Sequence, residues 1–239
     1  MVCPKCGHEN LPDRLDCLRC GVIFAKVRQE LAPSESIAVE PVETATKGVW
    51  PLDPASEDEY SWHLWGWSIG LLVMIVWGSK LIFVNIADNA AGTSLLHLVN
   101  LPFHEAGHVL LRPFGSFITS LGGTLGQLLI PLVCMVTLLL KNRDNFGAAV
   151  CLWWFGENFL DIAPYINDAR AAEMPLVGGN FGHSSPYGFH DWEYLLTESG
   201  LLHYGHALAK AAHLIGSLVM IGAVCWVGGL LYRQVRQRV

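Results

Sequence analysis

The chain of 239 residues contains 15% charged and 52% hydrophobic residues, and its mean hydropathy is +0.36. Soluble globular chains have roughly 25% charged residues, so this composition disfavours a soluble protein and favours long lipid-facing segments. The net charge of −6 lacks the basic character of nucleic-acid-binding proteins, and we expect no nucleic-acid partner. We predict a mainly α fold, a multi-span transmembrane helical bundle with a small N-terminal module.

Residues 1–27 form the N-terminal module, which contains two C-x-x-C pairs. Each pair forms a tight turn that directs two thiolates at one ion, and two such turns complete a tetrahedral zinc site. Gly7 and Gly21 follow the pairs, where a positive φ is expected. Two matched pairs favour a metal over a redox or disulfide pair. We therefore predict a zinc ribbon, with a structural Zn²⁺ held by Cys3, Cys6, Cys17 and Cys20.

Residues 28–61 are predicted to be an acidic, flexible linker. Four prolines interrupt this segment, and it shows no apolar periodicity. The region from residue 62 to residue 239 forms the predicted membrane domain. Its first spanning helix is expected at 64–87, behind an interfacial cluster of tryptophans, and Lys80 near its far end can snorkel to the interface.

The next segment, 93–112, is apolar but is interrupted by Pro102 and by several polar residues. The sequence FGSFITSLGG after it predicts a short extended hairpin that leads into a span at about 124–140. After the tight connector KNRDN we expect a span at about 146–163, terminated by Pro164, because proline disfavours helical geometry in the residue before it.

A polar loop at 165–205 and a last span at about 207–232 complete the predicted domain. Metal-binding thiols indicate a reducing compartment, so we expect the N-terminus in the cytoplasm. Lys141 and Arg143 mark a second cytoplasmic segment under the positive-inside rule. Both segments lie on the same side of the membrane, so an even number of crossings must separate them. The spans at 64–87 and 124–140 supply two crossings, which favours a re-entrant 93–112 segment over a third crossing. The total of four or five spans stays open.

His104, Glu105 and His108 form the motif HEAGH. Residues four apart lie on one face of a helix, so both imidazoles can bind one zinc ion, and Glu105 can act as general base. Ionisable groups at membrane depth are costly unless they have a partner, which favours a functional site. The alternative is a pair of hydrogen-bonded core histidines, which usually lack this spacing.

These segments resemble the site-2 protease class of intramembrane zinc metallopeptidases, closest to its bacterial branch. The resemblance is carried by HEAGHVLL at 104–111, SLGGTLGQLLIPL at 120–132 and ENFLDIAPYINDAR at 157–170, and it covers about residues 93–170. It implies a catalytic Zn²⁺, membrane-anchored protein substrates and a bacterial cytoplasmic membrane. In that class two histidines and a later aspartate bind zinc. His104 and His108 match the histidines, and Glu105 matches the general base.

The aspartate of that class precedes a glycine, a motif that this chain lacks. Asp161 is our first candidate for the third ligand, because it lies in an apolar span one helical turn from Glu157. Asp168 and Asp191 are the alternatives. The stretch His190-Asp191-Trp192 is a candidate lid over the site.

Gly122 and Gly123 lack side chains and would let a substrate strand approach, with strand addition along 116–121. A helix-packing glycine pair is an equal alternative.

Together these patterns predict a membrane zinc endopeptidase whose ribbon contacts a protein partner. The rival hypotheses are a zinc-binding membrane scaffold or adaptor without catalysis, and a transporter. The small number of spans and the absence of a sequence repeat count against a transporter.

Overall fold

A computed structural model describes residues 1–3, 5–11, 15–24, 57–177 and 179–236 of the chain. It consists of two units, Met1–Gly48 and Val49–Val239, which are considered separately below. Most of the predicted linker at 28–61 lies outside the described residues. Its last five residues are the exception, because the first membrane helix, α2 (Glu57–Ile82), already begins at Glu57.

The N-terminal unit repeats one turn twice. The N–H of Cys3 donates to the carbonyl of His8 (2.9 Å), and the N–H of Cys17 donates to the carbonyl of Val22 (2.9 Å). Each turn ends in a glycine with positive φ, +72° at Gly7 and +67° at Gly21, as the sequence predicts. Isolated β-bridges, Val2↔Glu9 and Asp16↔Ile23, close the two turns. The two C-x-x-C pairs therefore have the same local backbone conformation.

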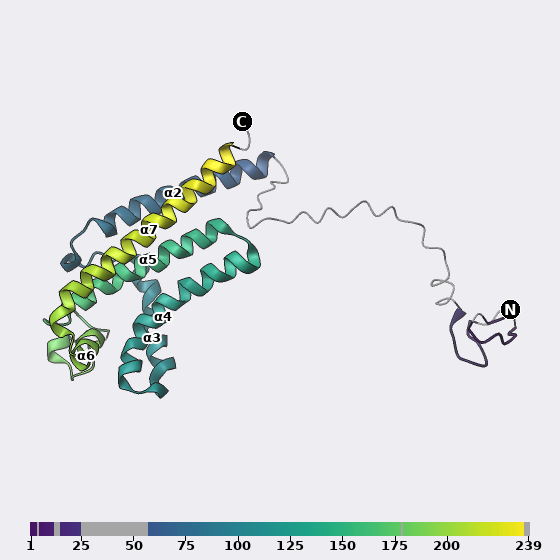
Figure 1. The fold of residues 1–239 in the computed structure, drawn as a ribbon, viewed down its shortest axis with the longest axis horizontal. Coiled ribbons are helices and arrows are strands. Elements are labelled where there is room, and N and C mark those ends of the chain that lie inside the picture. The colour runs from purple at the N-terminus through teal and green to yellow at the C-terminus, as the bar shows by residue number, and fades with distance from the viewer. Residues whose placement is uncertain (4, 12–14, 25–56, 178, 237–239) are drawn as a thin grey trace. The chain divides into compact units, whose positions relative to one another are not determined.

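The second unit is helical, which confirms the predicted fold class in its coarse form (Figure 1). Among the described residues, extended backbone pairs only in isolated bridges such as Pro175↔Phe181. Besides α2, the α-helices are α3 (Leu95–Leu111), α4 (Ser116–Thr137), α5 (Asn145–Asp168), α6 (Asp191–Glu198) and α7 (Gly205–Arg236).

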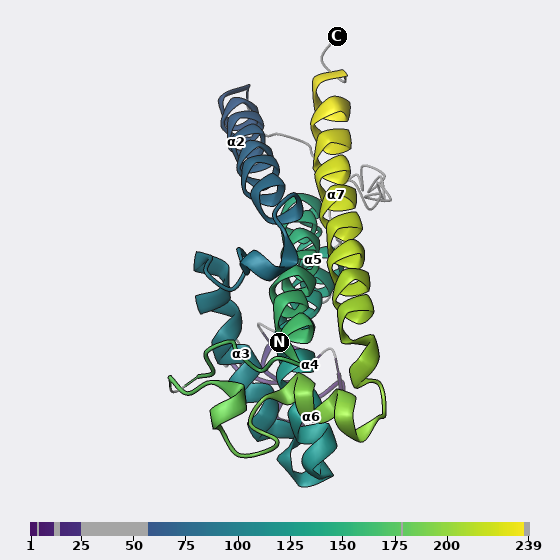
Figure 2. The same ribbon diagram turned by 90° about the vertical axis from the view of Figure 1, so that its left-hand side faces the viewer.

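Helix α5 lies at the centre of this unit. It packs along α7 on one side and against α4 on the other, while α2 contacts both α5 and α7 (Figure 2). A core cluster that includes Met74, Trp153 and Met220 joins α2, α5 and α7. Helix α3 packs on α4, and the short α6 covers the same end of α4 and α5. The metal-ligand candidates of the second unit lie at this end.

Glycines set the closest helix contacts. A Cβ on Gly107 of α3 would collide with the carbonyl oxygen of Gly122 in α4, and a Cβ on Gly126 would collide with the carbonyl oxygen of Phe103. Between α5 and α7, Gly156 and Gly216 approach in the same way. Small residues allow helix backbones to approach closely in membrane proteins. The helix-packing alternative for Gly122 is therefore the one that the structure supports.

The predicted extended hairpin at FGSFITSLGG is wrong. Residues 116–123 form the first turns of α4, which begins after Gly115 with φ +91°. The strand addition expected along 116–121 therefore has no strand edge in the described structure. Glycine and β-branched residues suggested an extended segment, but the close packing of α3 requires the same glycines in a helix.

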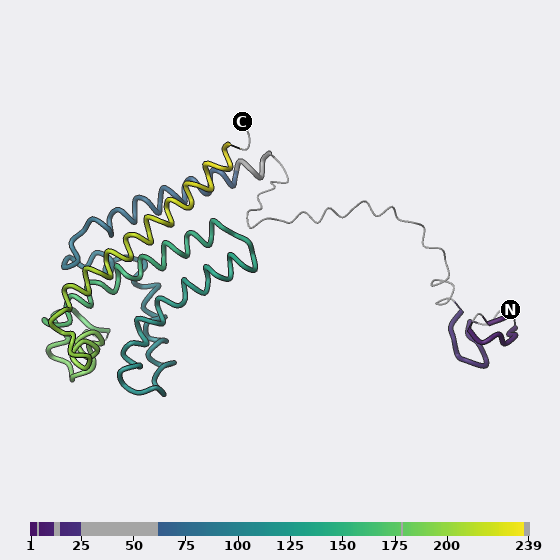
Figure 3. The backbone as a smooth tube through the Cα atoms, in the orientation of Figure 1, coloured from purple at the N-terminus to yellow at the C-terminus, as the bar shows by residue number. Residues whose placement is uncertain are grey.

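Pro164 does not terminate its helix, contrary to the prediction. Helix α5 continues through it to Asp168. Pro164 is buried among neighbouring helices, and tertiary packing of this kind compensates for the backbone hydrogen bond that proline removes. The predicted connector KNRDN is tight, because a π-helical turn (Leu138–Asn142) and Arg143 with φ +55° reverse the chain between α4 and α5 (Figure 3).

In the described part of the chain, three helical segments are long and apolar enough to cross a membrane: Trp62–Ile82, Ser116–Asn142 and Leu202–Arg236. They correspond to three of the predicted spans and agree with a membrane protein. Trp62 and Trp65 are exposed at the start of the first segment, as an interfacial belt requires. Trp67 instead stacks on Phe146, with ring centroids 5.1 Å apart. Whether 93–112 is re-entrant stays a prediction.

We predict that Gly107→Ala separates α3 from α4, because the added methyl has no room against the α4 backbone. Overpacking of this kind costs roughly 1–3 kcal/mol. The melting temperature of the detergent-solubilised protein should therefore fall by several degrees.

The matched control is Gly222→Ala in α7, where a Cβ meets no atom within 4 Å. It should leave the melting temperature unchanged or raise it, since alanine favours a helix over glycine. Equal melting temperatures of the two variants would contradict the close crossing.

Candidate metal centres

The four cysteine thiols of the N-terminal unit converge on one point. The Sγ atoms of Cys3 and Cys20 are 3.7 Å apart, and those of Cys6 and Cys17 are 3.6 Å apart. All four sulfur atoms lie within 4.8 Å of one another. Four convergent thiols are the ligand set of a closed structural zinc site, so the predicted residues fit a metal.

Asn10 supports this group, and sequence reasoning did not single it out. Its side chain donates to the Sγ of Cys17 (3.6 Å) and accepts the N–H of Leu18 (2.9 Å). Burial opposes ionisation of Cys17, but the N–H groups of Cys20 and Arg19 and the Asn10 amide together lower its pKa to about 6. A metal ligand must be a thiolate, so these donors favour the binding-competent form.

The second group lies where α3 meets α4 and α6, and it consists of His104, His108 and Asp191. The two imidazoles are one helical turn apart, with ring centroids separated by 4.7 Å. The Nε2 atom of each lies 3.3 Å from Oδ2 of Asp191. One ligand atom from each residue lies within 4.8 Å of the other two. The predicted pair of histidines thus has a carboxylate beside it.

Both imidazoles are oriented through their other nitrogen. The Nδ1 atom of His104 is 2.7 Å from Oε1 of Gln127, and that of His108 is 2.7 Å from the carbonyl oxygen of Thr119. Each oxygen can accept a hydrogen bond from Nδ1–H, and a neutral imidazole in that tautomer has the lone pair that binds a metal on Nε2. Metal-binding histidines are held by such outer partners. Both partners come from α4.

Gly123 provides the space for these rings. A Cβ at this position would collide with Nε2 of His104 and would approach Cε1 of His108 to 2.6 Å. Gly123 therefore leaves room for the imidazoles, whereas Gly122 allows the α3 and α4 backbones to approach closely. The absence of a side chain at Gly123 leaves a space on this face of α4 that the two imidazoles occupy.

Asp191 is positioned by the segment that the sequence suggested as a lid. It is the first residue of α6, whose N-cap His190 accepts the N–H of Glu193 (3.1 Å). His190 in turn contacts Asp168 (3.3 Å), and the backbone N–H of Asp191 donates to the Tyr165 hydroxyl (3.0 Å). Burial opposes ionisation of Asp191, but the electrostatic attraction of the His104 and His108 imidazoles outweighs burial and lowers its pKa.

Asp161, our first candidate for the third ligand, lies elsewhere. Its Oδ1 is 2.9 Å from Nδ1 of His97, and its Oδ2 accepts from Asn100 (3.1 Å) and from Gln127 (3.5 Å). The structure thus brings Asp191, and not Asp161, to the two imidazoles. The burial cost of Asp161 is met by hydrogen bonds in a polar network, which does not require a metal ligand.

Asp168, the other alternative, is also outside the group. Its carboxylate accepts the N–H groups of Glu173 (3.0 Å) and Met174 (2.8 Å) and contacts His190. It therefore fixes the loop that carries Asp191. Glu105 follows His104 on α3 and is exposed, and its charge lies within electrostatic range of His108.

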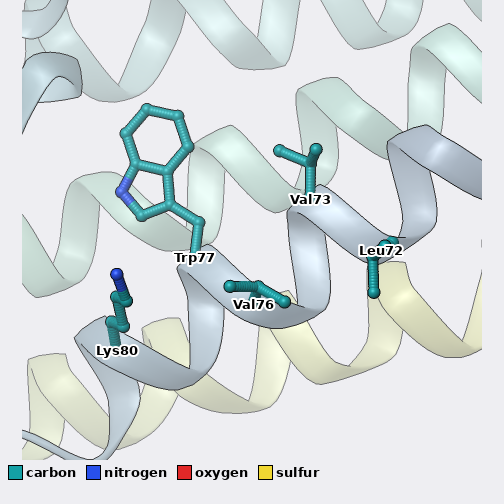
Figure 4. Close-up of a pocket in the computed structure, with 5 residues that line it drawn as sticks. All are labelled: Leu72, Val73, Val76, Trp77 and Lys80. Carbon is teal, nitrogen blue, oxygen red and sulfur yellow. The ribbon is translucent and has the colours of Figure 1, made fainter.

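A groove of about 470 Å³ also lies on the second unit (Figure 4). It is lined by Leu72, Val73, Val76, Trp77 and Lys80, all from α2. Its apolar walls belong to a candidate span, and Lys80 lies near the end of that span. An apolar groove of this kind is suited to lipid contact, and none of its residues belongs to either ligand group.

The two groups differ in the chemistry that they offer an ion. Four thiols leave no open position, whereas two imidazoles and one carboxylate leave a fourth position for water or a substrate. A three-ligand set with an open position is typical of catalytic metal sites.

Compared with protein-family models, curated proteins and solved structures, the chain matches none of them.

We predict that the purified protein binds two divalent ions per chain and that Cys17→Ser removes one of them. Loss of one thiolate opens the four-sulfur shell, while the ligands of the second unit are untouched. Elemental analysis of the variant should give about one ion per chain. Two retained ions would contradict the thiolate site.

We predict the complementary result for Gly123→Ala. The added methyl displaces the imidazole of His104, so this variant should lose the ion of the second unit and keep the ribbon ion. Gly222→Ala is again the control and should keep both. If Gly123→Ala also holds two ions, the assigned position of the imidazoles is incorrect.

Proposed function

We propose that this protein is a multi-pass membrane zinc metallopeptidase that hydrolyses peptide bonds of membrane-anchored proteins. The single observation that carries the proposal is the convergence of His104 and His108 with Asp191, beside a glutamate at the position of the HExxH base. The likeness of HEAGH and its neighbouring segments to the site-2 protease class supports the same reaction.

In this proposal, ion binding and proton transfer belong to different residues. His104, His108 and Asp191 hold the ion, with Asp191 in the role that the sequence suggested for Asp161. When bound there, zinc acts as a Lewis acid that polarises the scissile carbonyl and lowers the pKa of a water molecule. Glu105 takes the proton of the attacking water and delivers it to the leaving amine.

The surroundings of Glu105 favour a substrate within or near the bilayer. The exposed side of α3 around it is apolar and includes Leu98, Val99, Val109 and Leu110. The three candidate spans among the described residues support a membrane location for the same unit. A membrane-anchored polypeptide can therefore reach Glu105 along a surface that matches its own apolar character.

The remaining parts of the proposal concern location and regulation. The resemblance to the bacterial branch favours the bacterial cytoplasmic membrane, and the four thiols favour a cytoplasmic N-terminus. The ribbon has a closed ligand set and no open position for chemistry. We assign it a role in binding a protein partner, while the second unit performs the hydrolysis.

Glu105→Gln tests the proposal. The amide keeps the size of the side chain but cannot accept the proton, so cleavage should fall by at least about 100-fold. Both ions and the melting temperature should be retained. The measurement is mass spectrometry of new protein termini in membrane vesicles incubated with each purified variant.

Glu173→Gln is the matched control, because Glu173 is exposed and its described contact uses only its backbone N–H. It should cleave like the unmodified protein. New termini that are equally abundant with Glu105→Gln, or absent with every variant, would exclude the peptidase and leave the zinc-binding scaffold as the better description.

A further inference from the structure

The polar network around Asp161 forms a chain that ends at the metal ligand His104. It begins at Trp154, whose indole N–H donates to Oδ1 of Asn100 (2.8 Å). An indole can only donate, so it fixes the orientation of the Asn100 amide. The two N–H groups of that amide then face Oε2 of Glu157 (3.0 Å) and Oδ2 of Asp161 (3.1 Å).

Asp161 transmits this orientation to Gln127. Oδ2 of Asp161 accepts from the Asn100 amide and also faces Nε2 of Gln127, 3.5 Å away, so the amide N–H of Gln127 donates to Asp161. Its Oε1 consequently faces Nδ1 of His104 at 2.7 Å. The amide of Gln127 is buried, so water does not offer it another partner.

The orientation of Gln127 decides the tautomer of His104. An oxygen opposite Nδ1 requires the proton on Nδ1, which leaves Nε2 bare and able to bind a cation. A reversed amide would place an N–H group opposite Nδ1 and move the imidazole proton to Nε2, where it would block binding.

We propose that Asp161 is a positioning residue that acts through Gln127 to keep His104 in its metal-binding tautomer. This inference rests on the proposed metal site of the second unit. It gives the buried aspartate a role without making it a ligand. The neighbouring Glu157 shares Asn100 with Asp161, yet among its described hydrogen bonds it has none with Gln127. It therefore offers a matched comparison.

The test is the zinc affinity of the second unit in the full-length protein, measured by chelator competition on the more weakly held ion. Asp161→Asn can present an N–H group to Gln127 and permit the reversed amide. Its affinity should fall by roughly 10–100-fold, the usual effect of removing an outer partner. Glu157→Gln changes a similarly buried carboxyl group into an amide and should stay within about threefold of the unmodified protein.

A compensating variant separates orientation from general damage to the fold. Adding Gln127→Glu to Asp161→Asn places a carboxylate opposite Nδ1 of His104, which accepts in either orientation. The double variant should recover affinity to within about threefold of the unmodified protein. Equal losses for Asp161→Asn and Glu157→Gln, or no recovery in the double variant, would overturn the inference.

The visible spectrum of the Co²⁺-substituted protein distinguishes positioning from ligation. Asp161→Asn should keep the band shape of the unmodified protein, whereas Asp191→Asn should change it because a ligand is lost. The opposite pattern would make Asp161 the ligand and overturn the inference. If the unmodified protein holds only the ribbon ion, the metal site itself fails, and with it the proposed function.

Discussion

The close approach of the α3 and α4 backbones is the constraint on which the rest of the site depends. Gly107, Gly122 and Gly126 leave no space for a side chain between the helices. This contact brings both imidazoles of α3 against α4, where their Nδ1 atoms form hydrogen bonds with Oε1 of Gln127 and the carbonyl oxygen of Thr119. The Nε2 atom of each imidazole then lies 3.3 Å from Oδ2 of Asp191, which α6 supplies.

The second unit has many exposed apolar side chains, and it buries several polar side chains in its interior. Glu157, Asn158 and Asn100 are almost completely buried, and Asp161 is 7% exposed. Burying such groups costs several kcal/mol unless they are hydrogen-bonded. Hydrogen bonds among Trp154, Asn100 and Asp161 offset part of that cost, and through Gln127 they connect the central helix α5 to His104.

The two candidate centres differ in how far apart in the sequence their ligand residues lie. In the ribbon, two local turns supply all four ligands, and short-range backbone N–H groups stabilise the Cys17 thiolate. A local site of this kind can fold with its ion. In the helical unit, the ligands come from α3 and α6, and their orientation depends on α4 and α5. That site requires the packed bundle, which makes it sensitive to changes far from the ion.

The sequence by itself determined the parts of the protein that depend on local spacing. Two C-x-x-C turns followed by glycines predicted the thiol cluster, and the i, i+4 histidines of HEAGH predicted two imidazoles on one helix face. Long apolar runs predicted the helices that could cross a membrane. These features follow from the helical period and from turn geometry, which act over a few residues.

Tertiary structure decided which carboxylate lies beside the two imidazoles, the helical form of FGSFITSLGG and the continuation of α5 through Pro164. A buried carboxylate can be stabilised by a metal or by hydrogen bonds, and the sequence near Asp161 is the same in both cases. Only the folded chain places Asn100 and Gln127 beside Asp161 and brings Asp191, from a polar loop, to the imidazoles. Contacts between segments distant in sequence cannot be derived from periodicity, because they depend on how the helices pack.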